Sequence, residues 1–339
     1  MPAVRGVLVT ALSGPLGRFG RAGVAAFELW SQSMPEGVEL QVIDAHPDPA
    51  QAIRTAPQAD VLFGPYGAGP AVRAAGATDR VMWNHGGATV RLSRPGFSHV
   101  VNVPAPASTY FEGVVRAVRT ADPGCRSILV VHAATGFARE VAEGALSAGA
   151  GLDLTRIEYP PGRTAELQPT EADLLLVAGP FDDEVALAER LLPGGWRWAA
   201  FVGAGVEEVL PPELREGLLG PAQWLAEAVP DPDEGPTPEW FVGVYQDRTG
   251  TRPPYPAAQA FAAGVLWAAA AREAGTLDDQ AVLEAAFRLR CRTLFGEFRL
   301  DPRTGIQVGQ RLLAVQWQEG RRRVVWPPDL AAHQARPLG

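Results

Sequence analysis

The sequence predicts an α/β protein made of two Rossmann-like lobes, each built on a parallel sheet. Short apolar runs typical of strands alternate with segments of helical periodicity, which is the pattern of a parallel sheet covered by helices on both faces. The alternation restarts after the stretch HVVNVPAP, residues 99–106, so a second unit of similar build follows the first. A chain of 339 residues, 47% hydrophobic and 20% charged, is long enough for two domains with cores of their own.

In the first half, apolar runs predict strands and the amphipathic segments between them predict helices. The strands are expected at residues 4–12, 38–45, 59–64 and 80–84, and the helices at Gly17–Ser33, 48–56 and Pro70–Thr78.

The second half repeats this pattern and then changes character. A stretch dense in proline and acid, residues 227–240, predicts a surface connection, and the segment 297–326 predicts antiparallel strands with turns at Pro302–Gly305 and Glu319–Gly320. The other strands are expected at 127–133, 154–159, 172–179 and 197–205, and the helices at Tyr110–Thr120, Phe137–Gly149, Asp183–Leu192, Glu239–Arg248 and Ala257–Ala274.

Composition excludes several classes of function. The net charge is -8 and every basic residue is arginine, so the electrostatic footprint of a nucleic-acid-binding protein is missing. Two cysteines, Cys125 and Cys291, form neither a disulfide framework nor a metal cluster, and the histidines lack metal-ligand spacing. We therefore expect no nucleic-acid partner, no metal and no cofactor.

The sequence does not determine the cellular compartment of the protein. No run approaches the ~20 apolar residues of a membrane-spanning helix, so we expect no membrane insertion. The first residues, MPAVRGVLVTALSGPLG, lack the basic and apolar regions of a signal peptide and enter a strand pattern almost at once. We expect a periplasmic or extracellular protein if a signal has been removed, and a cytoplasmic one otherwise.

A glycine-rich loop in VLFGPYGAGPAVRAAG, residues 61–76, joins a strand to a helix and is suited to anion binding. It is not a dinucleotide fingerprint, because it follows the third strand and no acidic residue stands about 20 positions later. A second loop, NHGGAT at 84–89, follows the next strand. Neighbouring loops at this edge of an open sheet, both free of acids, predict a site for one small carboxylate.

Six stretches in register resemble the type I periplasmic solute-binding proteins of the leucine/isoleucine/valine and amide group, over nearly the whole chain. They are LSGPLGRFGRAGVAAFEL, DPAQAIR, VLFGPYGAG, ADLLLVAG, YPAAQAFAAG and LFGEFRLDPRTGIQVGQRLLAVQWQEG.

The resemblance implies two lobes that are joined by three crossovers and close on a ligand in the cleft between them, like a Venus flytrap. The crossovers are expected near Val103–Ala105, Gln223–Leu225 and Gly296–Arg299. Residues 1–104 and 226–296 would then form the N-terminal lobe, and 105–225 and 297–339 the C-terminal lobe.

The resemblance also implies which residues hold the ligand. The two glycine-rich loops would bind its carboxylate through backbone N–H groups and small hydroxyls. Relatives commonly present a serine where this chain has Gly67 and Ala68, so here more of the hydrogen bonds to the carboxylate would come from backbone N–H groups. The residues expected at this position are Gly67, Ala68, Gly87, Ala88 and Thr89.

On the facing lobe, the glutamate that pairs with an amino acid's ammonium group in relatives aligns with Ala204. Glu207, Asp182 or Asp183 could substitute, although adjacent acids at a strand end are more often solvated or cap a helix. An ammonium without a partner is costly to bury, so we expect a small carboxylate or amide with an apolar or aromatic body rather than a branched-chain amino acid.

Aromatic side chains are expected to meet the apolar part of the ligand, although simple core packing explains any one of them equally well. His85 follows a strand near the loops and could pair with the ligand, and Thr135 is a further candidate contact. The aromatic candidates are Phe19, Tyr66, Phe181, Trp224 and Tyr255.

Two classes of function compete. The first is non-enzymatic binding of a small solute, as the substrate-binding component of an ABC importer with a transporter permease as partner, or as a cytoplasmic ligand sensor of the same fold. The second is an α/β enzyme such as a dehydrogenase. The sequence contains no paired acid and base, no nucleophile elbow and no dinucleotide fingerprint, which favours binding over catalysis.

Overall fold

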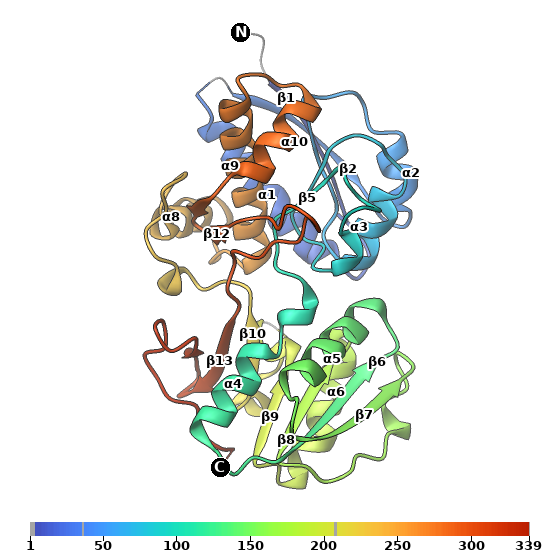
Figure 1. Ribbon diagram of the computed structural model, residues 1–339, viewed down its shortest axis with the longest axis vertical. Helices are drawn as coiled ribbons and strands as arrows, with labels where there is room; N and C mark the ends of the chain where they lie inside the picture. The colour runs from blue at the N-terminus through green and yellow to red at the C-terminus, as the bar shows by residue number, and fades with distance from the viewer. Residues whose placement is uncertain (1–3, 36, 207–208, 339) are drawn as a thin grey trace. The chain divides into compact units, whose positions relative to one another are not determined.

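The computed structural model describes residues 4–35, 37–206 and 209–338 (Figure 1). The chain forms two compact units. The first unit consists of residues 1–106 and 224–311, and the second of residues 107–223 and 312–339.

The first unit is larger than the expected N-terminal lobe, because it also contains residues 105–106, 224–225 and 297–311, which were expected in the C-terminal lobe. The last of these segments is held to the first unit by hydrogen bonds from its neighbours. The Asn102 side-chain amide donates to the Gly305 carbonyl oxygen at 3.0 Å, and the Ala105 N–H donates to Gln310 Oε1 at 3.1 Å. The chain therefore leaves the first unit after residue 311.

The first unit is built on a five-stranded parallel sheet in the order β2-β1-β3-β4-β5. The order places the loops after β1, β3 and β4 side by side at the carboxyl edge of the sheet. The strands are β1 (Val4–Thr10), β2 (Val38–Asp44), β3 (Val61–Phe63), β4 (Met82–Asn84) and β5 (Val100–Asn102). The helices are α1 (Gly17–Ser33), α2 (Pro49–Arg54), α3 (Ala68–Ala75), α8 (Pro238–Thr249), α9 (Tyr255–Ala274) and α10 (Asp279–Arg288).

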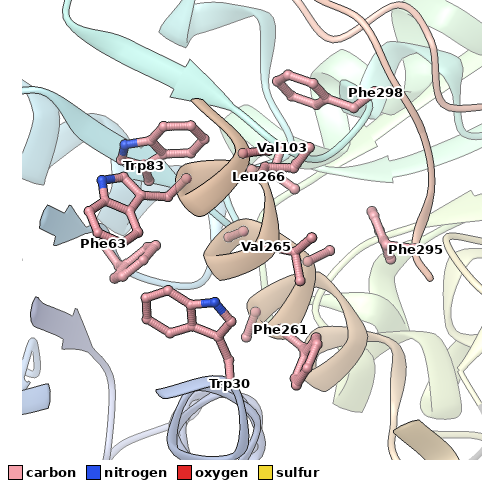
Figure 2. Packing of buried hydrophobic residues seen from close by; sticks show 14 of the residues in the cluster. Trp30, Phe63, Trp83, Val103, Phe261, Val265, Leu266, Phe295 and Phe298 are labelled. Atoms are coloured by element: carbon pink, nitrogen blue, oxygen red, sulfur yellow. The ribbon is translucent and has the colours of Figure 1, made fainter. Parts of the chain in front are cut away.

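The main core of this unit lies between the sheet and helices α1 and α9 (Figure 2). Trp30 of α1 packs edge-on against Phe63 of β3, with ring centroids 5.6 Å apart. Its indole also covers Gly264 of α9, where an added Cβ would lie 2.3 Å from the ring. The glycine that interrupts the alanine-rich helix is therefore needed for close helix packing.

The second unit is built on a seven-stranded sheet in the order β14-β13-β10-β9-β8-β6-β7. Strands β6 to β10 are parallel to one another, and β13 and β14 form an antiparallel hairpin at one edge. The strands are β6 (Ser127–Ala133), β7 (Asp153–Tyr159), β8 (Leu174–Ala178), β9 (Trp198–Phe201), β10 (Leu219–Ala222), β13 (Leu313–Gln318) and β14 (Arg321–Trp326). The helices are α4 (Glu112–Ala121), α5 (Gly136–Ala148), α6 (Phe181–Leu191) and α7 (Pro212–Arg215).

The α/β architecture with two parallel-dominated units confirms the fold class predicted from the sequence. The tail agrees only in part. A small hairpin of β11 (Cys291–Thr293) and β12 (Gly296–Phe298) belongs to the first unit, and only an isolated bridge between Leu300 and Gln307 joins the residues before β13. The turn at Glu319–Gly320 is present, with both residues at positive φ, as a type I′ hairpin turn requires. No helix in the described part of the chain is long and apolar enough to cross a membrane.

Candidate ligand-binding site

The two glycine-rich loops meet at the carboxyl edge of the first unit's sheet. Gly67 adopts a φ of 98°, which favours glycine, and its N–H donates to the Gly86 carbonyl oxygen at 3.0 Å. Gly86 in turn lies under Tyr66, since a Cβ at Gly86 would come within 2.6 Å of the tyrosine ring. The loops that follow β3 and β4 are thus locked together by backbone.

This arrangement changes which N–H groups can receive an anion. The N–H of Gly67 is engaged by Gly86, and the N–H of Gly87 donates to Asn84 Oδ1 at 2.7 Å. Two of the groups expected to hold a carboxylate are therefore already used within the loops. Ala68 opens helix α3, and N–H groups in the first turn of a helix have no acceptor inside the helix.

Asn84 was not expected in the site from the sequence. Its side-chain amide donates to the Gly87 carbonyl oxygen at 2.9 Å and to Asn102 Oδ1 at 2.8 Å, while its own oxygen receives the Gly87 N–H. These bonds tie the second loop to the ends of β4 and β5. The hydroxyl of Thr89 accepts the Arg91 N–H at 3.1 Å and so caps the short helix that follows.

An aromatic cluster stands beside the loops. We call Phe19, Tyr66 and Tyr255 the aromatic trio. The rings of Phe19 and Tyr66 stack with centroids 5.0 Å apart, and the hydroxyl groups of Tyr66 and Tyr255 are hydrogen-bonded. Arg18 lies 4.6 Å above the Phe19 ring. Burial raises the pKa of Tyr255 well above its usual range, so its hydroxyl stays protonated.

Two of the expected contacts, Trp224 and His85, are buried within the first unit. Trp224 packs edge-on to Phe241, and its indole N–H donates to the Leu294 carbonyl oxygen at 2.7 Å. His85 is 1% exposed, stands edge-on to Phe27 and has an Nδ1 without a partner among the described residues. Burial lowers the pKa of His85 to about 4, which keeps the imidazole neutral.

The candidates in the second unit follow the carboxyl ends of its strands. Thr135 caps α5, since its hydroxyl accepts the Ala138 N–H at 3.2 Å, and Phe181 is the first residue of α6. Ala204 is fully buried, and its carbonyl oxygen accepts the Trp317 indole N–H at 2.8 Å. Glu207 lies outside the described residues.

Acidic residues near these candidates fall into two kinds. Asp182 is exposed, as expected of a solvated acid at a helix start. Asp183 is buried and accepts the Gly162 N–H through both carboxylate oxygens. Glu184, which was not expected in the site from the sequence, is fully buried, and burial raises its pKa to about 8.

No group of three or more histidine, cysteine, aspartate or glutamate side chains suited to a metal occurs among the described residues.

Two parallel-dominated α/β units are the architecture of the type I periplasmic binding-protein fold. The family model for periplasmic binding proteins matches residues 6–322. The chain belongs to this family.

Solved structures of the same fold span almost the whole chain. A leucine-binding protein from Thermotoga maritima is 16% identical, with a TM-score of 0.80 and coverage of 96% of this chain and 99% of that one. A solute-binding protein of an ABC transporter from R. palustris, in complex with benzoate, is 17% identical, with a TM-score of 0.76 and coverage of 99% and 97%. A branched-chain amino acid transporter substrate-binding protein from Streptococcus pneumoniae, in complex with isoleucine, is 14% identical, with a TM-score of 0.79 and coverage of 96% and 100%.

Proposed function

We propose that this protein is a non-catalytic receptor for a small carboxylate or amide with an apolar or aromatic body, and that it serves as the substrate-binding component of an ABC importer. The observation that carries the proposal is that the aromatic trio lies next to the N-terminus of α3 in the first unit, since Tyr66 precedes Ala68 by two residues. An anion at the first turn of α3 is stabilised by unpaired N–H groups and by the helix dipole. The adjoining aromatic rings offer an apolar surface for the rest of the ligand.

The choice of ligand class rests on Ala204. By the resemblance, an α-amino acid would bring its ammonium group next to Ala204, which is fully buried and offers only a methyl group, and an unpaired buried charge is costly. A benzoate-like molecule carries no such group. The benzoate complex of the R. palustris protein shows that one protein of this fold binds an aromatic carboxylate, and the isoleucine complex shows that another binds an amino acid.

Thermal unfolding with benzoate, benzamide, leucine and isoleucine tests the ligand class. We expect benzoate to raise the melting temperature, since a ligand at 100 times its Kd stabilises the folded state by about 2.7 kcal/mol. Leucine and isoleucine should give a smaller shift at equal concentration. Leucine or isoleucine binding more tightly than benzoate, and lost on Glu207→Gln, would show that Glu207 supplies the ammonium partner and that the ligand is an amino acid.

A matched pair of variants locates the site. Phe19→Leu removes a ring of the aromatic trio and should lower the affinity for benzoate. Phe97→Leu removes a partly buried ring elsewhere in the same unit and should leave the affinity unchanged. Equal affinities of the two variants in calorimetry would place the ligand away from the trio.

The transport role has a second candidate of the same fold, a cytoplasmic ligand sensor. Both roles need the same ligand site and differ in compartment and partner. Recovery of the native protein in the periplasmic or extracellular fraction supports an importer that works with a transporter permease. Recovery in the cytoplasm supports the sensor.

A further inference from the structure

Glu184 connects two loops at the carboxyl edge of the second unit's sheet. Its Oε1 accepts the N–H of Gly179, the first residue after β8, at 3.0 Å. Its Oε2 accepts the N–H of Gly203, which follows β9, at 2.6 Å. The carboxyl group is completely buried, so both bonds form away from water, where a backbone N–H that loses its acceptor is left unsatisfied at a cost.

The fit around this carboxyl group is tight. A Cβ at Gly203 would lie 2.8 Å from Glu184 Oε2 and 2.5 Å from the Val209 side chain, so only glycine allows the backbone to approach this closely. A Cβ at Gly179 would come within 2.3 Å of the Tyr159 hydroxyl. The loop after β9 is therefore packed against the acid as well as bonded to it, and the loop after β8 is packed against Tyr159.

The bonded loops carry the second unit's candidate ligand contacts. Gly179 leads through Pro180 into Phe181, and Gly203 is followed directly by Ala204. The place of each contact thus depends on a backbone group that Glu184 holds. Asp183 extends the arrangement to the loop after β7, because it accepts the Gly162 N–H at 3.0 Å.

We propose that Glu184 is a positioning residue for ligand binding: its carboxyl group holds the loops after β8 and β9 in one arrangement, and this fixes the places of Phe181 and of the buried Ala204 at the carboxyl edge of the second unit's sheet. The proposal rests on the proposed function for the identity of that edge. Glu184 itself does not contact the ligand, since both its oxygens are bonded to backbone. Asp183 on the same helix and Tyr159 at the end of β7 are the titratable groups that act electrostatically on it.

The matched variants are Glu184→Gln and Glu189→Gln. Both remove one carboxylate from α6, but Glu189 is exposed and Glu184 is buried. In Glu184→Gln the side-chain NH₂ replaces one acceptor and faces a backbone N–H, so one of the two loops loses its bond. With benzoate as the probe in calorimetry, we expect Glu184→Gln to bind about tenfold more weakly or worse, the factor that corresponds to one such bond. Glu189→Gln should bind as the wild type does.

A second measurement needs neither ligand nor variant. In amide NMR spectra of the wild-type protein, the Gly179 and Gly203 N–H signals should move downfield together as pH rises through about 8, when the carboxyl group ionises and becomes the stronger acceptor. This reading stands even if benzoate does not bind, in which case the ligand proposal fails while the positioning of the loops is still tested. A Glu184→Gln protein whose Gly179 and Gly203 amide signals are unchanged, or whose affinity for benzoate is unchanged, would overturn the proposal.

Discussion

Tyr66 and Tyr255 lie 189 residues apart in the chain and share a hydrogen bond between their hydroxyl groups. Tyr66 belongs to the loop after β3, and Tyr255 opens helix α9. Because the Tyr66 ring also stacks on Phe19, this bond fixes the edge of the surface that we propose for the ligand's apolar part. The hydrogen bond between the two tyrosines therefore joins the loop after β3 to the start of α9 at the proposed binding site.

Tyr255→Phe removes this bond and keeps the ring. We expect the free energy of unfolding to fall by about 1 kcal/mol, the usual net value of one hydrogen bond, and the affinity for benzoate to fall as well. Urea denaturation and calorimetry measure the two effects. Tyr245→Phe is the control for affinity, because Tyr245 packs against Phe241 in the core and away from the trio. If both variants bind benzoate equally, the tyrosine pair does not shape the site.

Ala68→Asp places a negative charge at the first residue of α3. The helix dipole favours an acid there, so the protein should fold at least as stably as the wild type, while a carboxylate ligand meets a like charge. We expect benzoate affinity to fall by at least about tenfold relative to Ala68→Asn, which has nearly the same shape without the charge.

The loss of affinity in Ala68→Asp should be larger at low ionic strength, because salt screens the repulsion. Calorimetry at two salt concentrations measures this. Equal binding by the aspartate and asparagine variants would move the carboxylate away from α3.

The parallel sheets could be predicted because each buried strand is an apolar run that can be recognised from its own residues. The run around β3 is apolar at every position and is followed by glycines, which is sufficient to indicate a buried strand and a turn. Helix α10 was missed. Antiparallel strands with turns at Pro302–Gly305 and Glu319–Gly320 were expected over residues 297–326, but between β12 and β13 the structure has only an isolated bridge. Strand pairing depends on a neighbouring strand that the local pattern does not reveal.

The site could be predicted only as a location. The glycine loops after β3 and β4 were identified from the sequence. That the N–H groups of Gly67 and Gly87 are already hydrogen-bonded could not be, because their acceptors belong to Gly86 and Asn84, which the fold brings close. The three acids at the start of α6 looked alike in sequence. The rotation of the helix against the sheet exposes Asp182 and buries Glu184, and no local pattern determines that rotation.

Two glycines in helices should respond oppositely to alanine. Gly243 lies in the exposed interior of α8 with open space around it, so Gly243→Ala should stabilise the fold by about 0.5–1 kcal/mol through helix propensity. At Gly20 of α1, a Cβ would lie 1.7 Å from the Ala11 carbonyl oxygen. Gly20→Ala should therefore cost more than about 2 kcal/mol, because α1 must move away from the sheet.

Urea denaturation of both alanine variants measures these changes. The displacement in Gly20→Ala should also reach the adjacent Phe19 and weaken benzoate binding. A stable Gly20→Ala protein would show that α1 does not lie this close to β1.

The buried His85 should make the protein sensitive to acid. Its pKa is about 4 in the folded state and about 6.5 in an unfolded chain, so between these values the unfolded state binds one more proton. The contribution of His85 to stability is therefore fully present above pH 6.5 and is lost as pH falls to 4. Over this window it amounts to about 3 kcal/mol.

Urea denaturation between pH 7.5 and 4.5 isolates this contribution when the wild type is compared with His85→Gln. Glutamine does not titrate, so the variant lacks the extra proton uptake on unfolding. The difference in unfolding free energy between the two proteins should shrink as pH falls, whereas His46→Gln, at an exposed position, should follow the wild-type curve. Parallel pH curves for wild type and His85→Gln would mean that His85 binds its proton equally well in both states, and that the imidazole is reached by water in the folded protein.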